Sequence, residues 1–232
     1  MTIGTKSRYS ILHIVLLFII FLFYYLVTEL FIRLYPDINK HLGIIFTILF
    51  KIFLDSSFFL YILIIMKKNN VNIKSELKIS IMKKDLLWGI LSGFGALLPV
   101  AVLSYYLLKD DSYIVAPRMI NILMGGSHYL TLVFSFLSIC ILGPFIEELV
   151  FRGYLWKIFE EKKLNKIIVL LITSFLFASI HLEINRFLIL FTLGIIIGFL
   201  RMRTDRMGAS VVAHMTLNII GFISIVLSAN LE

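Results

Sequence analysis

Two adjacent carboxylates and an arginine interrupt a long apolar stretch of this chain. They lie in the run Gly-Pro-Phe-Ile-Glu-Glu-Leu-Val-Phe-Arg-Gly at positions 143–153. Charged side chains are costly at membrane depth, so Glu147, Glu148 and Arg152 need partners or a function there. Later apolar runs carry two histidines and an asparagine. A carboxylate, imidazoles and an amide suit the activation of water and the stabilisation of the oxyanion formed when a carbonyl is attacked.

Helical spacing separates the roles of the two glutamates. Neighbouring residues on a helix point about 100° apart, so Glu147 and Glu148 cannot both face one small site. Glu148 and Arg152 are four residues apart, which predicts an internal ion pair that orders the helix and offsets part of the cost of burial. Glu147 is then left to face His181. The competing interpretation is that Glu147 itself forms a structural ion pair with Arg152.

The remaining polar groups complete a hypothetical site for water activation. We expect Glu147 to act as general base and His181 to orient the same water. His214 and Asn218, four residues apart on one helix face, would donate hydrogen bonds to the oxyanion. Phe177, four residues before His181, is expected to pack against the histidine and fix it. Alternatively, His214 and Asn218 only join helices, and His181 lies at the membrane interface.

Seven apolar runs must position these side chains. They predict an all-α, polytopic transmembrane helix bundle of about seven spans, in a single domain over residues 1–232. The runs cover residues 10–34, 42–66, 86–108, 129–159, 167–182, 187–200 and 207–229. A basic segment at 67–84 and a polar connection at 109–127 separate the first four.

The turns between the runs predict a common depth for the site. Glu147 and His181 each lie 17 residues from the turn between the fourth and fifth runs. His214 and Asn218 follow the turn at Asp205 by roughly 13 to 20 Å of helix, at 1.5 Å per residue. The four groups should therefore share one layer between the cytoplasmic surface and the bilayer midplane.

Charge sets the expected orientation. With the amino terminus inside, fifteen Lys and Arg residues fall on the cytoplasmic side and five on the other. This asymmetry favours an inside amino terminus and a site open to the cytoplasm. The net charge of +8 therefore reflects loop charge, and we expect no nucleic acid partner. The single cysteine, Cys140, excludes an internal disulfide and a thiolate cluster.

Smaller features predict close packing within the bundle. Lys51 and Asp55, and likewise Glu29 and Arg33, are four residues apart and should neutralise each other. Glycines at 89, 93 and 95 and the Gly-x-x-x-Gly pair at 194 and 198 should permit close helix contact.

Three motifs together resemble the CAAX-processing and bacteriocin-processing (CPBP, Abi-type) intramembrane protease family. They are Glu147-Glu148-x-x-x-Arg152, Phe177-x-x-x-His181 and His214-x-x-x-Asn218, in that order on successive apolar runs. The resemblance covers residues 129–230. It implies a glutamate-dependent endopeptidase in which the first Glu and the second-motif His activate water, the second Glu pairs with the Arg, and the third-motif His and Asn stabilise the oxyanion.

The resemblance also raises the question of a metal. Such proteins are often labelled metalloproteases, and zinc, if bound, would take Glu147, His181 and His214. The chain has no His-Glu-x-x-His helix, and these three residues come from separate helices. Zinc could still accept ligands from three helices, but the resemblance implies a metal-free glutamate mechanism, which we favour, with no cofactor and with zinc as the alternative.

The expected substrate is a membrane-associated or leader-bearing peptide, cleaved at a bacterial plasma membrane. The abundance of Ile, Lys, Asn and Phe suggests the bacterial source, and bacteriocin or pheromone maturation or bacteriocin immunity follows by analogy. One alternative function is a non-catalytic membrane scaffold or bacteriocin self-immunity protein. A transporter is another, although no pair of interrupted helices in corresponding halves supports it.

Overall fold

The structure is a computed structural model in which residues 10, 12–35, 40–108 and 129–229 are described. The polar connection expected at 109–127 lies outside these residues.

The described residues are all-helical, as predicted. The helices of the first half are α1 (Leu12–Leu34), α2 (Lys40–Lys68), the short α3 (Ile73–Glu76) and α4 (Lys83–Leu107). A continuous rod follows, made of α6 (Tyr129–Phe136), the π-helical η1 (Leu137–Leu142), α7 (Gly143–Glu148), the π-helical η2 (Leu149–Leu155) and α8 (Trp156–Glu161). The last helices are α9 (Lys166–Ser179), the 3-10 turn η3 (Ile184–Arg186), α10 (Phe187–Thr204) and α11 (Gly208–Ala229).

Six helices within the described residues are long and apolar enough to cross a bilayer. They correspond to six of the seven predicted runs. The fifth run also forms a helix, α9, but its 14 residues extend only about 21 Å. A span needs roughly 20 residues, so α9 is too short to cross the bilayer by itself. The chain is an integral membrane protein; the side on which its amino terminus lies stays a prediction.

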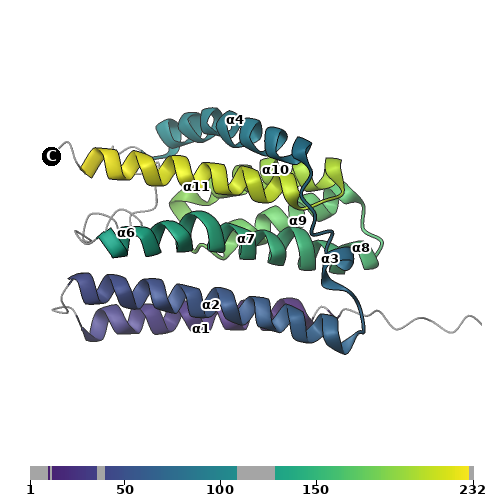
Figure 1. The fold of residues 1–232 in the computed structure, drawn as a ribbon, viewed down its shortest axis with the longest axis horizontal. Coiled ribbons are helices and arrows are strands. Elements are labelled where there is room, and N and C mark those ends of the chain that lie inside the picture. Colours follow the sequence, from purple (N-terminus) through teal and green to yellow (C-terminus); the bar gives the residue numbers. More distant parts are fainter. Residues whose placement is uncertain (1–9, 11, 36–39, 109–128, 230–232) are drawn as a thin grey trace, which may run out of the picture.

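The rod from α6 to α8 lies between two helix pairs (Figure 1). The α1–α2 hairpin lies along one side of it, and α11 with α4 along the other. The main core cluster joins α1, α2, η2 and α11, and it includes Leu17, Ile62, Leu149, Tyr154 and Val211. Large apolar side chains on the outer faces are exposed, as lipid-facing side chains of a bundle are. The rod is therefore the element that every other part of the site packs against.

Contacts between loops tie one end of the bundle together. Arg206 Nη2 donates to Asp85 Oδ1 at 2.7 Å, and the Met207 amide donates to the Lys78 carbonyl at 3.1 Å. Partial burial raises the pKa of Asp205, but the hydrogen bond from Arg201 and the positive charges of Arg201, Lys78 and Lys166 together outweigh it and keep that pKa below its ordinary value. The basic segments at 67–84 and 201–206 thus lie at the same end of the molecule, as the predicted orientation requires.

Two glycines of α4 allow α11 to approach closely. A Cβ at Gly89 would lie 2.5 Å from the Val212 Cβ, and one at Gly93 would lie 2.7 Å from the Thr216 Cβ. The prediction of close helix contact is confirmed at both positions. It is wrong at Gly95, where a Cβ would meet nothing within 4 Å because this residue points away from α11.

Gly89, which contacts α11, and Gly95, which does not, give a matched test of this packing. Gly89→Ala should destabilise the protein by about 1–3 kcal/mol, because the added methyl forces α4 and α11 apart. Gly95→Ala, on the same helix, should be neutral or slightly stabilising. Thermal unfolding of both variants in detergent measures the difference. Equal stability of the two variants would contradict the packing described here.

Candidate active site

The helix that carries the two glutamates departs from α-helical geometry on both sides of them. In η1 the Gly143 amide bonds to the Ser138 carbonyl, five residues back. The next amide in this pattern would belong to Pro144, which has no N–H to give to the Ile139 carbonyl. Asn218 Nδ2 donates to that carbonyl at 2.8 Å instead. One amide hydrogen of Asn218 thus joins α11 to the rod, and the amide retains a second hydrogen.

Glu148 and Arg152 form the predicted ion pair. Arg152 Nη1 donates to Glu148 Oε1 at 3.2 Å, and both side chains are completely buried. The same carboxylate oxygen lies 2.9 Å from His214 Nδ1. Arg152 Nη2 donates to the Gly194 carbonyl at 2.8 Å, which connects the pair to α10. A Cβ at Gly194 would lie 3.0 Å from the Ser174 Cβ, so the predicted close contact of α9 and α10 is confirmed here.

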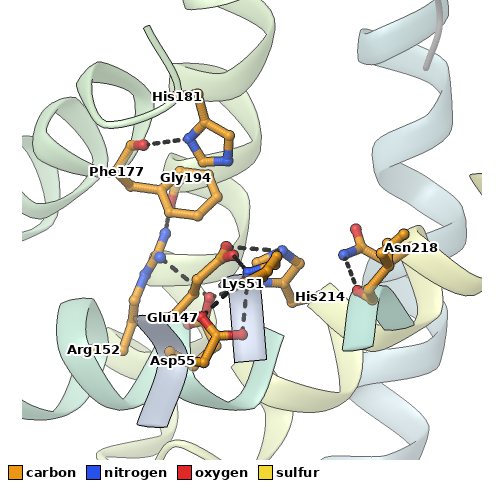
Figure 2. A network of polar contacts seen from close by, with 11 residues as sticks. Lys51, Asp55, Glu147, Arg152, Phe177, His181, Gly194, His214 and Asn218 are labelled. Carbon is orange, nitrogen blue, oxygen red and sulfur yellow. Dashed lines mark hydrogen bonds and ion pairs between the residues drawn. The ribbon is translucent and has the colours of Figure 1, made fainter. Parts of the chain in front are cut away.

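Glu147 lies in a different environment from its neighbour. Its side chain is 21% exposed, whereas that of Glu148 is 0% exposed, so only Glu147 can meet water or a substrate. Lys51 Nζ lies 3.6 Å from Glu147 Oε1, and His214 Nε2 lies 3.8 Å from Glu147 Oε2. Figure 2 shows these side chains converging from α2, α7 and α11.

Lys51 and Asp55 form the ion pair expected on α2. Lys51 Nζ lies 3.2 Å from each carboxylate oxygen of Asp55. The sequence pattern did not predict that this pair reaches Glu147. The sequence shows two opposite charges inside an apolar run, and this pattern indicates that each charge has a partner but does not identify that partner.

His181 occupies the turn that follows α9. Its Nδ1 lies 2.8 Å from the Phe177 carbonyl, which can only accept, so Nδ1 carries the proton and Nε2 is the nitrogen that can accept a hydrogen bond. We expected Glu147 to face His181. Among the described residues, the basic groups within ion-pairing distance of Glu147 are Lys51 and His214.

The ring of Phe177 lies at the centre of the basic groups. Its centroid is 4.9 Å from that of His181 and 5.6 Å from that of His214. The Arg152 Cζ lies 4.8 Å from the same ring centroid. The contact with His181 is the one predicted for Phe177, whereas its contacts with His214 and Arg152 were not predicted.

The arrangement does not fit a zinc site. Within the part of the chain that is described, no three His, Cys, Asp or Glu side chains come together closely enough to hold a metal ion. Glu147, one of the three expected ligands, has the Lys51 ammonium 3.6 Å from its Oε1. A ligand set of Glu147, His181 and His214 would therefore have to rearrange before it could bind zinc.

An apolar pocket opens beside Glu147. Its other lining side chains come from α1, α2, the rod and the end of α9: Leu17, Phe18, Phe21, Phe58, Val150, Phe151, Leu155 and Ile180. The first two helices, which carry no recognised motif, therefore contribute to the surroundings of the glutamate.

Together, these features describe a helical integral membrane protein with a charged, partly exposed site inside its bundle. Residues 129–220 match the family described as type II CAAX prenyl endopeptidase Rce1-like. This segment contains all six polar motif residues, so the resemblance inferred from the motifs is confirmed over it.

A curated protein gives a second, shorter match. Over 78 residues the chain is 32% identical to a protein of Bacillus subtilis (strain 168) described as "Putative membrane peptidase YdiL". The match covers 34% of this chain and 32% of that protein, so the chain spans about a third of its relative's length. No solved structure gives a significant match.

The buried ion pair makes a prediction about stability. Arg152→Met should destabilise the protein by about 3 kcal/mol, because it removes the buried guanidinium that pairs with Glu148. Arg33→Met removes an exposed pair of the same i, i+4 type on α1 and should cost about 1 kcal/mol or less. Unfolding in detergent measures both. A loss for Arg152→Met no larger than for Arg33→Met would contradict the structural role of the pair.

Proposed function

We propose that the protein is an intramembrane endopeptidase that hydrolyses a peptide bond in a membrane-associated or leader-bearing peptide. The observation that carries this proposal is the partly exposed Glu147 carboxylate, which is held next to His214 and beside an apolar pocket. The Rce1-like family of residues 129–220 supports it. The apolar pocket suits a substrate segment that arrives through the membrane.

In the proposed mechanism, Glu147 takes a proton from a water molecule. The water oxygen attacks the carbonyl carbon of the peptide bond, and the carbonyl oxygen becomes an oxyanion. His181 accepts a hydrogen bond at Nε2 from the second hydrogen of the water, which stays on the water oxygen, and so orients the water. Glu147 then passes its proton to the departing amine nitrogen as the carbon–nitrogen bond breaks. Hydrolysis is complete with the two peptide fragments released.

His214 and Asn218 are proposed to stabilise the oxyanion. His214 donates Nδ1–H to Glu148, so it can donate to a substrate through Nε2 only as an imidazolium. In that form its two ring nitrogens would pair with the carboxylates of Glu147, at 3.8 Å, and Glu148, at 2.9 Å. Asn218 would use the amide hydrogen that it does not give to Ile139. The positive charge of His214 would then oppose the developing negative charge on the substrate.

We propose that the reaction needs no metal. The imidazolium of His214 can supply the electrostatic stabilisation that a Lewis acid would otherwise provide, and Glu147 can activate the water as a base. We further propose that the site opens toward the cytoplasm of a bacterial cell, on the side of the basic loops. The non-catalytic alternative, a scaffold or bacteriocin self-immunity protein, differs in needing no chemistry at Glu147.

Replacing Glu147 by Gln separates the two functions. The substitution keeps the shape of the side chain but removes the base, so peptide release should fall by about 100-fold or more. Mass spectrometry of peptides from cells that produce the wild type or Glu147→Gln measures this loss. Glu29→Gln on α1 is the matched control and should leave the peptides unchanged. Equal peptide release by the wild type and by Glu147→Gln, at equal protein levels, would refute the catalytic proposal.

Chelation tests the proposed absence of a metal. Purified protein treated with EDTA and 1,10-phenanthroline should cleave the same peptides at an unchanged rate. Metal analysis of the active fraction should find zinc well below one ion per chain. Stoichiometric zinc, with activity lost on stripping and regained on adding zinc back, would contradict the proposal.

A further inference from the structure

We propose that Lys51 is a positioning residue of the active site, which holds the Glu147 carboxylate in place from the second helix while Asp55 anchors it. The inference assigns a role to a part of the chain that carries none of the three motifs. Its effect on turnover rests on the proposed function, but the contact itself does not.

The first argument is the geometry of the Glu147 carboxylate. Lys51 Nζ lies 3.6 Å from Oε1 and His214 Nε2 lies 3.8 Å from Oε2. The terminal torsion of a glutamate is broad, so a single contact leaves the carboxylate free to rotate. Two basic groups, one on each oxygen and each from a different helix, limit that rotation. A fixed carboxylate is what a general base needs to meet its water in a productive geometry.

The second argument is the anchoring of Lys51 itself. Its ammonium lies 3.2 Å from both oxygens of Asp55, whose side chain is only 7% exposed. A lysine side chain is flexible and loses much rotamer freedom when it is held in one place. The contact with both Asp55 oxygens holds the ammonium in place independently of Glu147. Asp55 therefore fixes where the Lys51 ammonium of α2 lies relative to the rod.

The third argument is the space that the rod leaves for the ammonium. A Cβ at Gly143 would lie 3.2 Å from Lys51 Nζ and 3.3 Å from its Cε. The same Cβ would lie 2.9 Å from the Ser138 carbonyl oxygen. A glycine at the start of α7 therefore lets the end of the lysine pack directly against the backbone of the rod, one helical turn before Glu147.

The fourth argument is charge balance. Asp55 and Glu147 are both carboxylates and both contact the one ammonium of Lys51. If Lys51 only neutralised Asp55 on the same helix, it would need no contact with a third group on α7. Without Lys51, Asp55 and Glu147 would be two carboxylates with no cation from α2 between them. One shared cation lowers the cost of keeping both carboxylates inside the bundle.

The experiment compares three variants with the wild type. Lys51→Met/Asp55→Leu removes the pair without leaving a lone buried charge, and Lys51→Arg keeps the cation. Arg33→Met removes an exposed ion pair on α1 as the control. Turnover is measured with a library of internally quenched synthetic peptides that carry apolar segments. The position of the Glu147 carboxylate is measured by cryo-electron microscopy of each protein in lipid nanodiscs.

We expect the double variant to lose about 10- to 100-fold in kcat with KM changed by no more than about twofold. Lys51→Arg should keep kcat within about threefold of the wild type, and Arg33→Met should leave it unchanged. In the structures, the Glu147 carboxylate should move by about 1 Å or more from His214 in the double variant alone. If that variant does not fold, Lys51→Gln/Asp55→Asn serves the same comparison.

An unmoved carboxylate together with unchanged kcat would overturn the inference. A rise in KM alone would also overturn it, because Lys51 would then act on the substrate and not on Glu147. If the wild type cleaves the library no faster than Glu147→Gln does, the proposed function fails. The carboxylate position still decides, in that case, whether Lys51 holds Glu147.

Discussion

The cost of placing charge inside an apolar helix bundle is the constraint on which the rest of this structure depends. Glu148 and Arg152 are completely buried, and each has a further partner on another helix, His214 on α11 and the Gly194 carbonyl on α10. The ion pair therefore does more than neutralise itself. It ties the rod to α10 and α11 and holds His214 through the Glu148 carboxylate. The packing of the carboxyl-terminal half and the geometry of the site therefore both depend on the buried Glu148–Arg152 pair.

Pro144 explains one unusual hydrogen bond of the rod. Pro144 cannot supply the amide that the Ile139 carbonyl needs in a π-helix, so Asn218 supplies it from α11. The two glutamates lie just after this junction, between the two π-helical segments. Such segments often occur at functional sites, because they change the direction of side chains along a helix that otherwise continues. Here the two glutamates between the π-helical segments differ in environment: Glu148 is buried, and Glu147 lines a pocket.

Much of the fold could be predicted from the sequence, because long apolar runs have one stable structure in a bilayer. All seven runs are helical, and the spacing of Glu148 and Arg152 was enough to predict their pair. The fifth run was predicted to extend to residue 182, because apolar residues continue past Ser179, but α9 ends at Ser179.

The parts of the site that depend on which helices are neighbours could not be predicted. Nothing in the spacing of Lys51 and Asp55 indicates that α2 packs against α7. The partner of Asn218 is a backbone carbonyl, which has no signal in the sequence. The number of residues between each side chain and the turn predicted that Glu147 and His181 lie at the same depth in the membrane. Depth alone does not determine which basic group is nearest to a carboxylate.

In the proposed mechanism, Glu147 and His181 share one water molecule within a charged network drawn from several membrane helices. A high-resolution cryo-electron microscopy structure of the wild type in lipid nanodiscs would locate that water. We expect an ordered water within hydrogen-bonding distance of the Glu147 carboxylate and the Nε2 of His181. A Glu147 side chain turned into lipid, or a metal ion bound by Glu147 and the two histidines, would contradict it.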